Sequence, residues 1–142
     1  MIVRDARPTD ISAIHRLIGQ LADAPDQAAF RMRLDRVAAT DGHRIVVAEV
    51  EGKVIGVLHV FERPALEKPC EAVVQALVVD SDARSSGVGE ALMREAERWA
   101  ADHALSSVAL YTRVDRDRAR AFYEGIGYLQ KATSRLMGRD LA

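Results

Sequence analysis

The feature that most constrains the fold is a nearly unbroken apolar stretch at residues 72–79, AVVQALVV, which leads directly into the glycine-containing loop SDARSSGVG. A strand with one face in water alternates apolar and polar residues, whereas a strand buried on both faces reads as a continuous apolar run. The stretch therefore predicts a central strand of a sheet, and the loop predicts a tight turn that passes straight into a helix.

The loop has the composition of an anion-binding turn. The first N–H groups of a helix have no partner within the helix and lie at the positive end of its dipole. Gly87 and Gly89 allow a diphosphate to approach the backbone closely, and Arg84 and the two serines after it can add donors. A turn that needs glycine only for its geometry would look the same. The sequence excludes a P-loop, which needs GK[ST], and a Rossmann fingerprint, which needs a glycine where Leu92 stands.

Hydrophobic periodicity and turn residues predict the other elements. They are a strand at 2–6, a helix from residue 11 with Asp10 as its N-cap, a helix near 26–39, a hairpin of 44–50 and 53–62 about Gly52, a helix from 88 to about 101, a strand at 107–112, a helix within 115–127 capped by Gly127, and a final strand pair within 128–139. This order predicts an α+β fold in which a mixed, mostly antiparallel, twisted sheet of six to seven strands is flanked by about four helices.

Composition excludes several classes of protein. The 142 residues suit a single domain spanning 1–142, and a net charge of −1 excludes a global basic field for nucleic acid or an anionic membrane. One cysteine, Cys70, rules out a disulfide framework and a CxxC metal site, and His15, His43 and His103 lack metal-ligand spacing. No apolar run approaches the roughly 20 residues of a membrane span. We expect a cytoplasmic protein without a metal.

Two motifs in the correct order give the chain a family resemblance. Arg84, Gly87 and Gly89 fit R/Q-x-x-G-x-G/A, which resembles motif A of the GNAT superfamily of N-acetyltransferases. Downstream, ARAFYEGIGY at 119–128 is similar to motif B of that family, and VVAEVEGKVIGVLHV at 46–60 resembles its hairpin. The resemblance covers essentially the whole chain and implies a GNAT-like fold.

The resemblance also implies a cosubstrate, acetyl-CoA, and a reaction in which a primary amine attacks the thioester directly. The implied cofactor-binding residues supply backbone groups to pantetheine, cradle the pyrophosphate, or contact the cofactor from motif B. They are Leu77, Val78 and Val79 for pantetheine, Arg84, Ser85, Ser86, Gly87, Val88, Gly89, Glu90 and Ala91 for the pyrophosphate, and Arg116 and Tyr123.

The reaction needs an acid for the departing thiolate and a base for the amine. Tyr123 matches the tyrosine of motif B that is proposed to protonate the sulfur. Many family members carry a glutamate where this chain has Gln75, and glutamine cannot accept a proton. Strand alternation would put residues 71, 73, 75 and 77 on one face, so Glu71 is one candidate base, and His59 on the neighbouring strand is the other. The alternative interpretation is that neither residue is catalytic, and that Glu71 is a solvated charge at the end of a strand and His59 a half-buried strand residue.

Arg116 stands where many members have an asparagine, seven residues before the tyrosine. Arg116 and Arg120 share a side of the helix with Tyr123, so one of them can meet a CoA phosphate. The alternative is a solvated basic face balanced by Asp115 and Asp117.

The acceptor is less constrained, because the first two helices mix aspartates and arginines with no dominant sign. The arginine in motif B and its GY ending resemble the branch with aminoalkylphosphonate and aminoglycoside acetyltransferases, which implies a small-molecule amine substrate. The alternatives are an amine of a protein or peptide, and a non-catalytic module that senses acyl-CoA. By the same resemblance a homodimer is possible.

Overall fold

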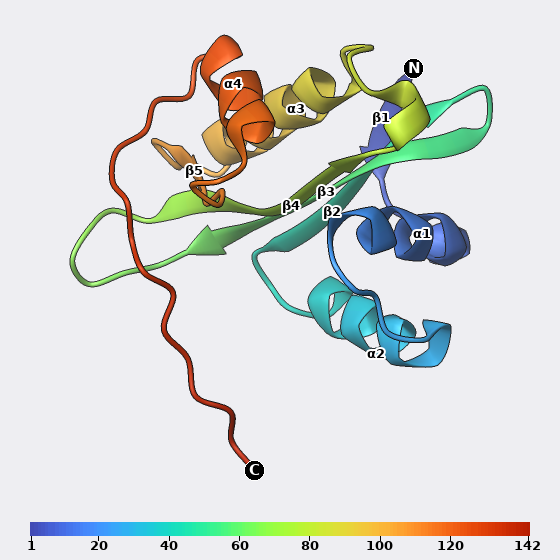
Figure 1. Ribbon diagram of the computed structural model, residues 1–142, viewed down its shortest axis with the longest axis horizontal. Helices are drawn as coiled ribbons and strands as arrows, with labels where there is room; N and C mark the ends of the chain where they lie inside the picture. The colour runs from blue at the N-terminus through green and yellow to red at the C-terminus, as the bar shows by residue number, and fades with distance from the viewer. The chain divides into compact units, whose positions relative to one another are not determined.

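The computed structural model describes residues 1–142, and the chain forms two compact units, Met1–Leu110 and Tyr111–Ala142. The first unit contains, in chain order, β1 (Ile2–Asp5), the 3₁₀ turn η1 (Pro8–Asp10), α1 (Ile11–Leu21), α2 (Gln27–Ala38), β2 (His43–Val50), β3 (Lys53–Arg63), β4 (Glu71–Val79), the 3₁₀ turn η2 (Ser81–Ala83), α3 (Val88–Asp102) and β5 (Val108–Leu110) (Figure 1). The second unit contains α4 (Asp117–Gly125). The predicted α+β class and the four helices are confirmed.

The sheet has five strands in the order β1-β2-β3-β4-β5. The first three pairings are antiparallel and the last, between β4 and β5, is parallel, so the sheet is mixed and mostly antiparallel as predicted. The predicted count of six to seven strands is wrong, because residues 128–142 form no helix or strand. A strand forms only where another strand pairs with it. The residue pattern at 128–139 favours an extended backbone but does not determine whether a neighbouring strand is present.

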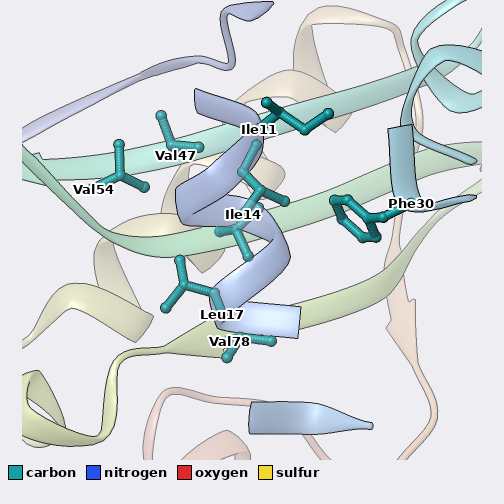
Figure 2. Close-up of a cluster of buried hydrophobic side chains, with 8 residues drawn as sticks. Ile11, Ile14, Leu17, Phe30, Val47, Val54 and Val78 are labelled. Carbon is teal, nitrogen blue, oxygen red and sulfur yellow. The ribbon is translucent and has the colours of Figure 1, made fainter. Parts of the chain in front are cut away.

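The helices cover the sheet on both faces, α1 and α2 on one and α3 on the other (Figure 1). On the first face, Ile11, Ile14 and Leu17 of α1 and Phe30 of α2 pack against four valines of the sheet, which are Val47, Val54, Val57 and Val78 (Figure 2). On the second face a side chain at Gly56 would meet Val88 and Leu92 of α3 at 3.0 Å. Glycine therefore lets α3 pack directly on β3.

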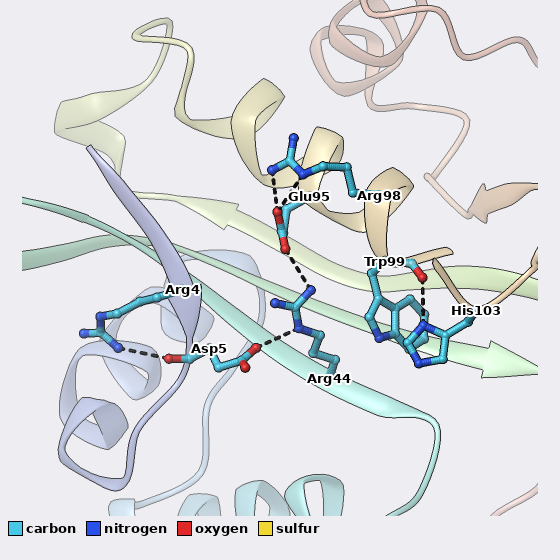
Figure 3. Close-up of polar contacts among 7 residues, drawn as sticks. All are labelled: Arg4, Asp5, Arg44, Glu95, Arg98, Trp99 and His103. Carbon is cyan, nitrogen blue, oxygen red and sulfur yellow. Dashed lines mark hydrogen bonds and ion pairs between the residues drawn. The ribbon is translucent and has the colours of Figure 1, made fainter. Parts of the chain in front are cut away.

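Arg44 holds α3 to the edge of the sheet. Its guanidinium donates to Asp5 of β1 at 2.7 Å and to Glu95 of α3 at 3.0 Å, and Arg98 pairs with the same Glu95 (Figure 3). At the end of the helix, His103 hydrogen-bonds the carbonyl of Trp99 at 2.8 Å. The position of α3, and with it the position of its N-terminus, is therefore set by polar contacts as well as by packing.

Asp10 is the N-cap residue of α1, which confirms the prediction, but its side chain makes no hydrogen bond to the first N–H groups of the helix. Its buried carboxylate instead accepts two hydrogen bonds from Arg4, at 2.8 and 3.0 Å, and one from the Arg7 N–H at 2.7 Å. The Arg4 guanidinium, and then the Arg7 N–H, hold the pKa of Asp10 below its usual value against the opposite effect of burial. Asp10 therefore ties β1 to the turn before α1.

A bulge interrupts β4 at Gln75. The consecutive residues His59 and Val60 of β3 face Ala76 and Val74, so Gln75 has no partner. Paired residues share a face of the sheet, and the bulge shifts the alternation of β4 by one residue. The prediction that residues 71, 73, 75 and 77 share a face is therefore wrong. Glu71 lies on the same face of the sheet as Val78, at the opposite end of β4.

The second unit is organised by the end of α4. Gly127 has a φ of 104°, and the Tyr128 N–H donates to the Tyr123 carbonyl at 2.9 Å. A left-handed glycine followed by this backward hydrogen bond is the usual way to satisfy the last carbonyls of a helix. The predicted role of Gly127 as the C-terminal cap is confirmed.

Candidate functional site

The first component of the candidate site is the half of β4 that has a strand on only one side. β5 pairs with β4 only from Ala72 to Val74, so residues 75–79 have β3 on one side and no strand on the other. Unpaired backbone N–H and C=O groups in a sheet are costly unless something else bonds them. This half of β4 is therefore an edge to which an extended ligand can hydrogen-bond.

The hydrogen-bond pattern identifies which groups of β4 face the open side. Asp80 donates its N–H to the Ile55 carbonyl at 2.8 Å. By alternation the backbone of Val78 also faces β3, whereas the backbones of Leu77 and Val79 face the open side. The Val79 carbonyl accepts a hydrogen bond from Arg84 Nε at 3.3 Å. The open side thus offers both backbone groups of Leu77 and the N–H of Val79.

Asp80 anchors the loop that follows β4. Its carboxylate is buried, accepts a hydrogen bond from Arg16 of α1 at 2.6 Å, and accepts another from the Asp82 N–H at 3.2 Å. The Arg16 guanidinium, and then the Asp82 N–H, hold the pKa of Asp80 below its usual range. Asp80 therefore stays ionised and fixes the start of the loop to α1.

The loop ends in a nest of N–H groups at the start of α3. Ser85 and Gly87 both have left-handed backbones, with φ of 66° and 86°. The first hydrogen bond of the helix runs from the Ala91 N–H to the Gly87 carbonyl, and the N–H groups of residues 85–90 have no acceptor in the protein. A side chain at Gly87 would meet nothing within 4 Å, so the nest is open to solvent. Such a nest binds an anion of phosphate size.

Some side chains of this loop are already engaged within the protein, and others are exposed to solvent. The Ser86 hydroxyl donates to the Ala83 carbonyl, and Glu90 pairs with Arg94 at 3.2 Å. Val88 is buried in the core against Gly56, while Ser85 is exposed. Backbone N–H groups, and not side-chain hydroxyls, are therefore the main donors that the loop offers.

His59, one candidate base, lies half-buried on the α1 face of β3, opposite Ala76 and next to the bulge. Its Nε2 is 2.9 Å from Nδ1 of His43, and both rings pack near Phe61. Burial, with a smaller contribution from His43, lowers the pKa of His59 to about 4. The ring is neutral at pH 7 and is a weak base.

This shift gives the stability of the protein a pH dependence. Above pH 6.5 His59 is neutral in both states, while between pH 6.5 and 4 only the unfolded chain binds the proton. Stability is thus lost as the pH falls through this window, by about 1 to 2 kcal/mol once partial exposure is allowed for. Urea unfolding at both ends of the window should show this loss, and His59→Phe should lack it. An equal loss in the variant would contradict the assignment, because the carboxylates titrate alike in both proteins.

Glu71, the other candidate base, stands at the start of β4 opposite Arg63. Its carboxylate pairs with Lys68 at 2.8 Å and with Arg63. Lys68, and then Arg63, lower the pKa of Glu71 against the opposite effect of burial. The two cations therefore make this carboxylate a poorer proton acceptor than a free glutamate.

Tyr123 lies in the second unit, in the middle of α4, and is half-buried. Its ring packs edge-on against Phe122 at 5.1 Å and Tyr128 at 6.1 Å between centroids. Burial raises the pKa of its hydroxyl. A raised pKa keeps the phenol protonated at neutral and moderately alkaline pH, as a proton donor requires.

The arginines near Tyr123 differ in their pairing. Arg116 is the exposed N-cap residue of α4 and forms no ion pair, whereas Arg120 pairs with Glu124 at 3.0 Å. Asp115, expected to balance the face, pairs with Arg113 at 2.9 Å. Of Arg116 and Arg120, Arg116 is therefore the one that is available to an added phosphate.

A cleft of about 610 Å³ lies elsewhere in the first unit, at the edge formed by β1, the start of β2, α2 and the end of α3. Its lining mixes Arg7, Arg31 and Arg44 with Asp5, Asp35 and Glu62, so no charge sign dominates. None of the residues predicted from the sequence as catalytic or cofactor-binding lines it. The cleft does not define a ligand class.

Sequence reasoning missed Asp80 and Arg16, which position the loop without belonging to a motif. The sequence shows an aspartate, Asp80, directly after an apolar strand. Its partner, Arg16, lies 64 residues earlier, so no local pattern joins the two. The structure contains no helix of the length and apolar character needed to cross a membrane, and no cluster of three or more possible metal ligands.

Comparisons with known proteins agree with this geometry. Residues 12–128 match the acetyltransferase (GNAT) family. No curated protein matches the sequence. Among solved structures, the chain resembles aminoglycoside 6'-N-acetyltransferase AAC(6')-Ig from Acinetobacter haemolyticus (TM-score 0.89, 18% identity, 100% of both chains). It also resembles a putative acetyltransferase from Agrobacterium tumefaciens (TM-score 0.88, 25% identity, 98% of this chain and 100% of that chain).

A third similar structure is AAC(6')-Iy in complex with the bisubstrate analogue CoA-S-monomethyl-acetylneamine (TM-score 0.87, 17% identity, 99% of this chain and 98% of that chain). These structures share the fold of the chain. The chain belongs to the acetyltransferase (GNAT) family. It is an N-acetyltransferase, and its cosubstrate is acetyl-CoA.

Proposed function

We propose that the protein transfers the acetyl group of acetyl-CoA to a primary amine of a small molecule, and that residues 1–142 act as one acetyltransferase domain in the cytoplasm. The observation that carries the proposal is the continuity of two unsatisfied backbone surfaces. The open edge at Leu77 and Val79 is joined by one short loop to the nest at residues 85–90. A ligand such as acetyl-CoA, in which an amide-containing arm is joined to a diphosphate, fits them, with the arm along the open edge and the diphosphate in the nest.

In this proposal the donor is bound mainly by backbone groups. Leu77 and Val79 bond the amides of the pantetheine arm, while Val78 supports the strand from the core. The nest at residues 85–90 receives the pyrophosphate, with Gly87 and Gly89 giving access to it, while the N–H of Ala91 is already used within the helix. The exposed Arg116 supplies a charge-assisted contact to a phosphate.

The reaction forms a bond between the amine nitrogen and the acetyl carbon and breaks the bond between that carbon and sulfur. The amine loses one proton, and the thiolate that leaves gains one. We assign the second proton to the Tyr123 hydroxyl, because its raised pKa keeps it protonated at working pH.

The proton of the amine goes to water in this scheme. Neither His59 nor Glu71 has a pKa near neutrality, the range in which a general base is most effective. Both lie on the face of the sheet that α1 packs against, His59 on β3 and Glu71 on β4, and His59 is the closer of the two to the bulge at Gln75. In this scheme each of them accepts a hydrogen bond from the water that takes the proton. His59 accepts it with a ring nitrogen of the neutral imidazole, and Glu71 accepts it with its carboxylate.

The small-molecule acceptor is supported by two observations. Several similar structures are described as aminoglycoside acetyltransferases, one of them with a bisubstrate analogue. The helices α1 and α2 also lack the single-signed surface that would select a charged peptide. The competing functions are acetylation of a peptide or protein amine, and acyl-CoA sensing without turnover, which Gln75 in place of a glutamate favours.

An acceptor panel separates the three functions. Purified protein is incubated with acetyl-CoA and with small amines, polyamines, aminoglycosides or peptides, and free thiol is followed over time. We expect release of thiol with at least one small amine and no release above background with peptides. Release with peptides only would overturn the small-molecule proposal. Binding of acetyl-CoA without release on any acceptor would identify a sensor.

A further inference from the structure

Two histidines on neighbouring strands form a hydrogen-bonded pair that runs across the sheet. His43 of β2 and His59 of β3 lie on the same face, and Nδ1 of His43 is 2.9 Å from Nε2 of His59. His43 also stacks on Phe61, with ring centroids 4.9 Å apart and an interplanar angle of 8°. At 2.9 Å one of the two facing nitrogens carries a proton and donates it to the other. The two rings are therefore linked by a proton that lies between β2 and β3.

The outer nitrogen of each ring remains open to water. Nδ1 of His59 and Nε2 of His43 bond no protein atom, and neither is sealed from solvent. A neutral imidazole accepts a proton at one ring nitrogen and can release the proton that the other nitrogen carries. Two linked imidazoles can therefore pass a proton from the outer nitrogen of one ring to the outer nitrogen of the other.

The His59 end of the pair lies close to the expected position of the thioester. In the proposed function, on which this inference rests, the pyrophosphate occupies the nest after β4 and the pantetheine arm bonds Val79 and then Leu77. The arm continues in the same direction, so the thioester lies beside β4 near Gln75. His59 faces Ala76, the residue next to Gln75. A ligand beside β4 is about 10 Å, or two strand spacings, from β3, and the imidazole with a short chain of waters spans that gap.

The His43 end of the pair opens into the cleft of about 610 Å³. His43 lines this cleft, whereas His59 does not. Other lining residues, among them Asp5, Arg31 and Asp35, are charged and exposed, so the cleft is polar and continuous with solvent. The pair therefore joins the region of the bulge at one end to bulk water at the other.

We propose that the proton of the acceptor amine leaves the site through His59 and then His43, and enters the water of the cleft. A water molecule takes the proton from the amine and gives one to Nδ1 of His59. The proton on Nε2 of His59 passes to Nδ1 of His43, and the proton on Nε2 of His43 passes to water in the cleft. One proton enters and one leaves, so both rings end neutral. Their starting tautomers return when the hydrogen bond between the rings opens and both exchange protons with water.

The low pKa of His59 is compatible with this relay. Burial, and then His43, lower this pKa to about 4, so His59 passes a proton on and does not store it. Transfer from an amine with a pKa of about 10 is uphill by about 6 pKa units, which lowers the limiting rate from about 6 × 10¹² to about 6 × 10⁶ s⁻¹. Enzymes commonly turn over at about 1 to 10³ s⁻¹, so the relay is fast enough.

Replacement of His43 tests the relay by kinetics. His43→Ala should lower kcat by about 10-fold or more without changing the affinity for acetyl-CoA, and added imidazole should restore turnover from the space that the substitution leaves. His43→Gln can still accept the hydrogen bond of His59 but cannot pass a proton on, so it should show the same loss. An unchanged kcat in either variant, or a loss in His43→Ala that imidazole does not restore, would overturn the relay.

His103→Ala is the matched control. His103 lines the same cleft, but its ring hydrogen-bonds the carbonyl of Trp99 and not another histidine. Its substitution should leave turnover at the wild-type value, with no response to imidazole. A loss equal to that of His43→Ala, restored by imidazole to the same extent, would overturn the assignment to the histidine pair.

Nitrogen-15 NMR of the resting protein at neutral pH separates failure of the relay from failure of the proposed function, because it requires no turnover. Both rings should carry their proton on Nε2, and a coupling across the hydrogen bond should join Nε2 of His59 to Nδ1 of His43. A proton on Nδ1 of His59, or absence of the coupling, would overturn the relay even in an active acetyltransferase. Correct NMR signals in a protein that releases no thiol with any acceptor would overturn the proposed function, and the relay with it.

Discussion

Replacing Tyr123 by phenylalanine is expected to lower turnover by about 100-fold or more, the usual effect of removing a general acid. The ring and its edge-on contacts with Phe122 and Tyr128 remain, so α4 should keep its structure. The substitution removes only the hydroxyl, whose proton is held by a pKa that burial raises. Affinity for acetyl-CoA should therefore be unchanged while kcat falls.

The measurement is steady-state thiol release together with calorimetric titration of acetyl-CoA. Tyr111→Phe is the matched control, because it removes a hydroxyl from an exposed tyrosine of the same unit. Its turnover should equal that of the wild type. If Tyr123→Phe also keeps wild-type turnover, another group protonates the sulfur. If both variants lose activity equally, the loss does not report on acid catalysis.

Replacing Gly89 by tryptophan is expected to abolish detectable binding of acetyl-CoA. Gly89 is the second residue of α3, within the N–H nest at residues 85–90. A bulky side chain there would keep a diphosphate away from the N–H groups. Each lost hydrogen bond to a charged group is worth about 1.5 to 3 kcal/mol, so losing two weakens binding by roughly 100-fold or more.

Gly19→Trp is the matched control, because Gly19 also lies in a helix and a side chain there would meet nothing within 4 Å. Both variants should unfold at similar temperatures, and only Gly89→Trp should fail to bind acetyl-CoA in a calorimetric titration. Wild-type affinity in the folded Gly89→Trp protein would mean that the diphosphate binds elsewhere. The variant tests donor binding alone and is independent of the identity of the acceptor.

Local patterns predicted the central part of the fold well. The apolar stretch before the loop predicted β4, and the glycines predicted the turn into α3, because each depends on neighbouring residues only. The capping role of Gly127 was predictable for the same reason. Asp10 is the N-cap residue of α1 as predicted, but the partner of its side chain, Arg4 on a strand, could not be read from the residues before the helix.

The details of the candidate site depended on contacts that a local pattern does not contain. The bulge at Gln75 could not be predicted, because most residues around it are apolar and either phase of the alternation fits. The low pKa of His59 arises from burial and from His43 on another strand. The pair of Asp80 and Arg16 joins elements 64 residues apart in sequence.

The bulge at Gln75 has a consequence for how this chain tolerates mutation. Gln75 is exposed and has no partner on β3, so a change of side chain there should cost little. Deletion of the same residue would make Ala76 follow Val74 directly, and these two residues already face the consecutive residues His59 and Val60. Every pair of β3 and β4 would therefore be kept, Val78 would stay in the core, and only the local bend and added twist of the bulge would be lost. At this position we therefore expect both the side chain and the presence of the extra residue to vary in evolution while the register on either side stays fixed.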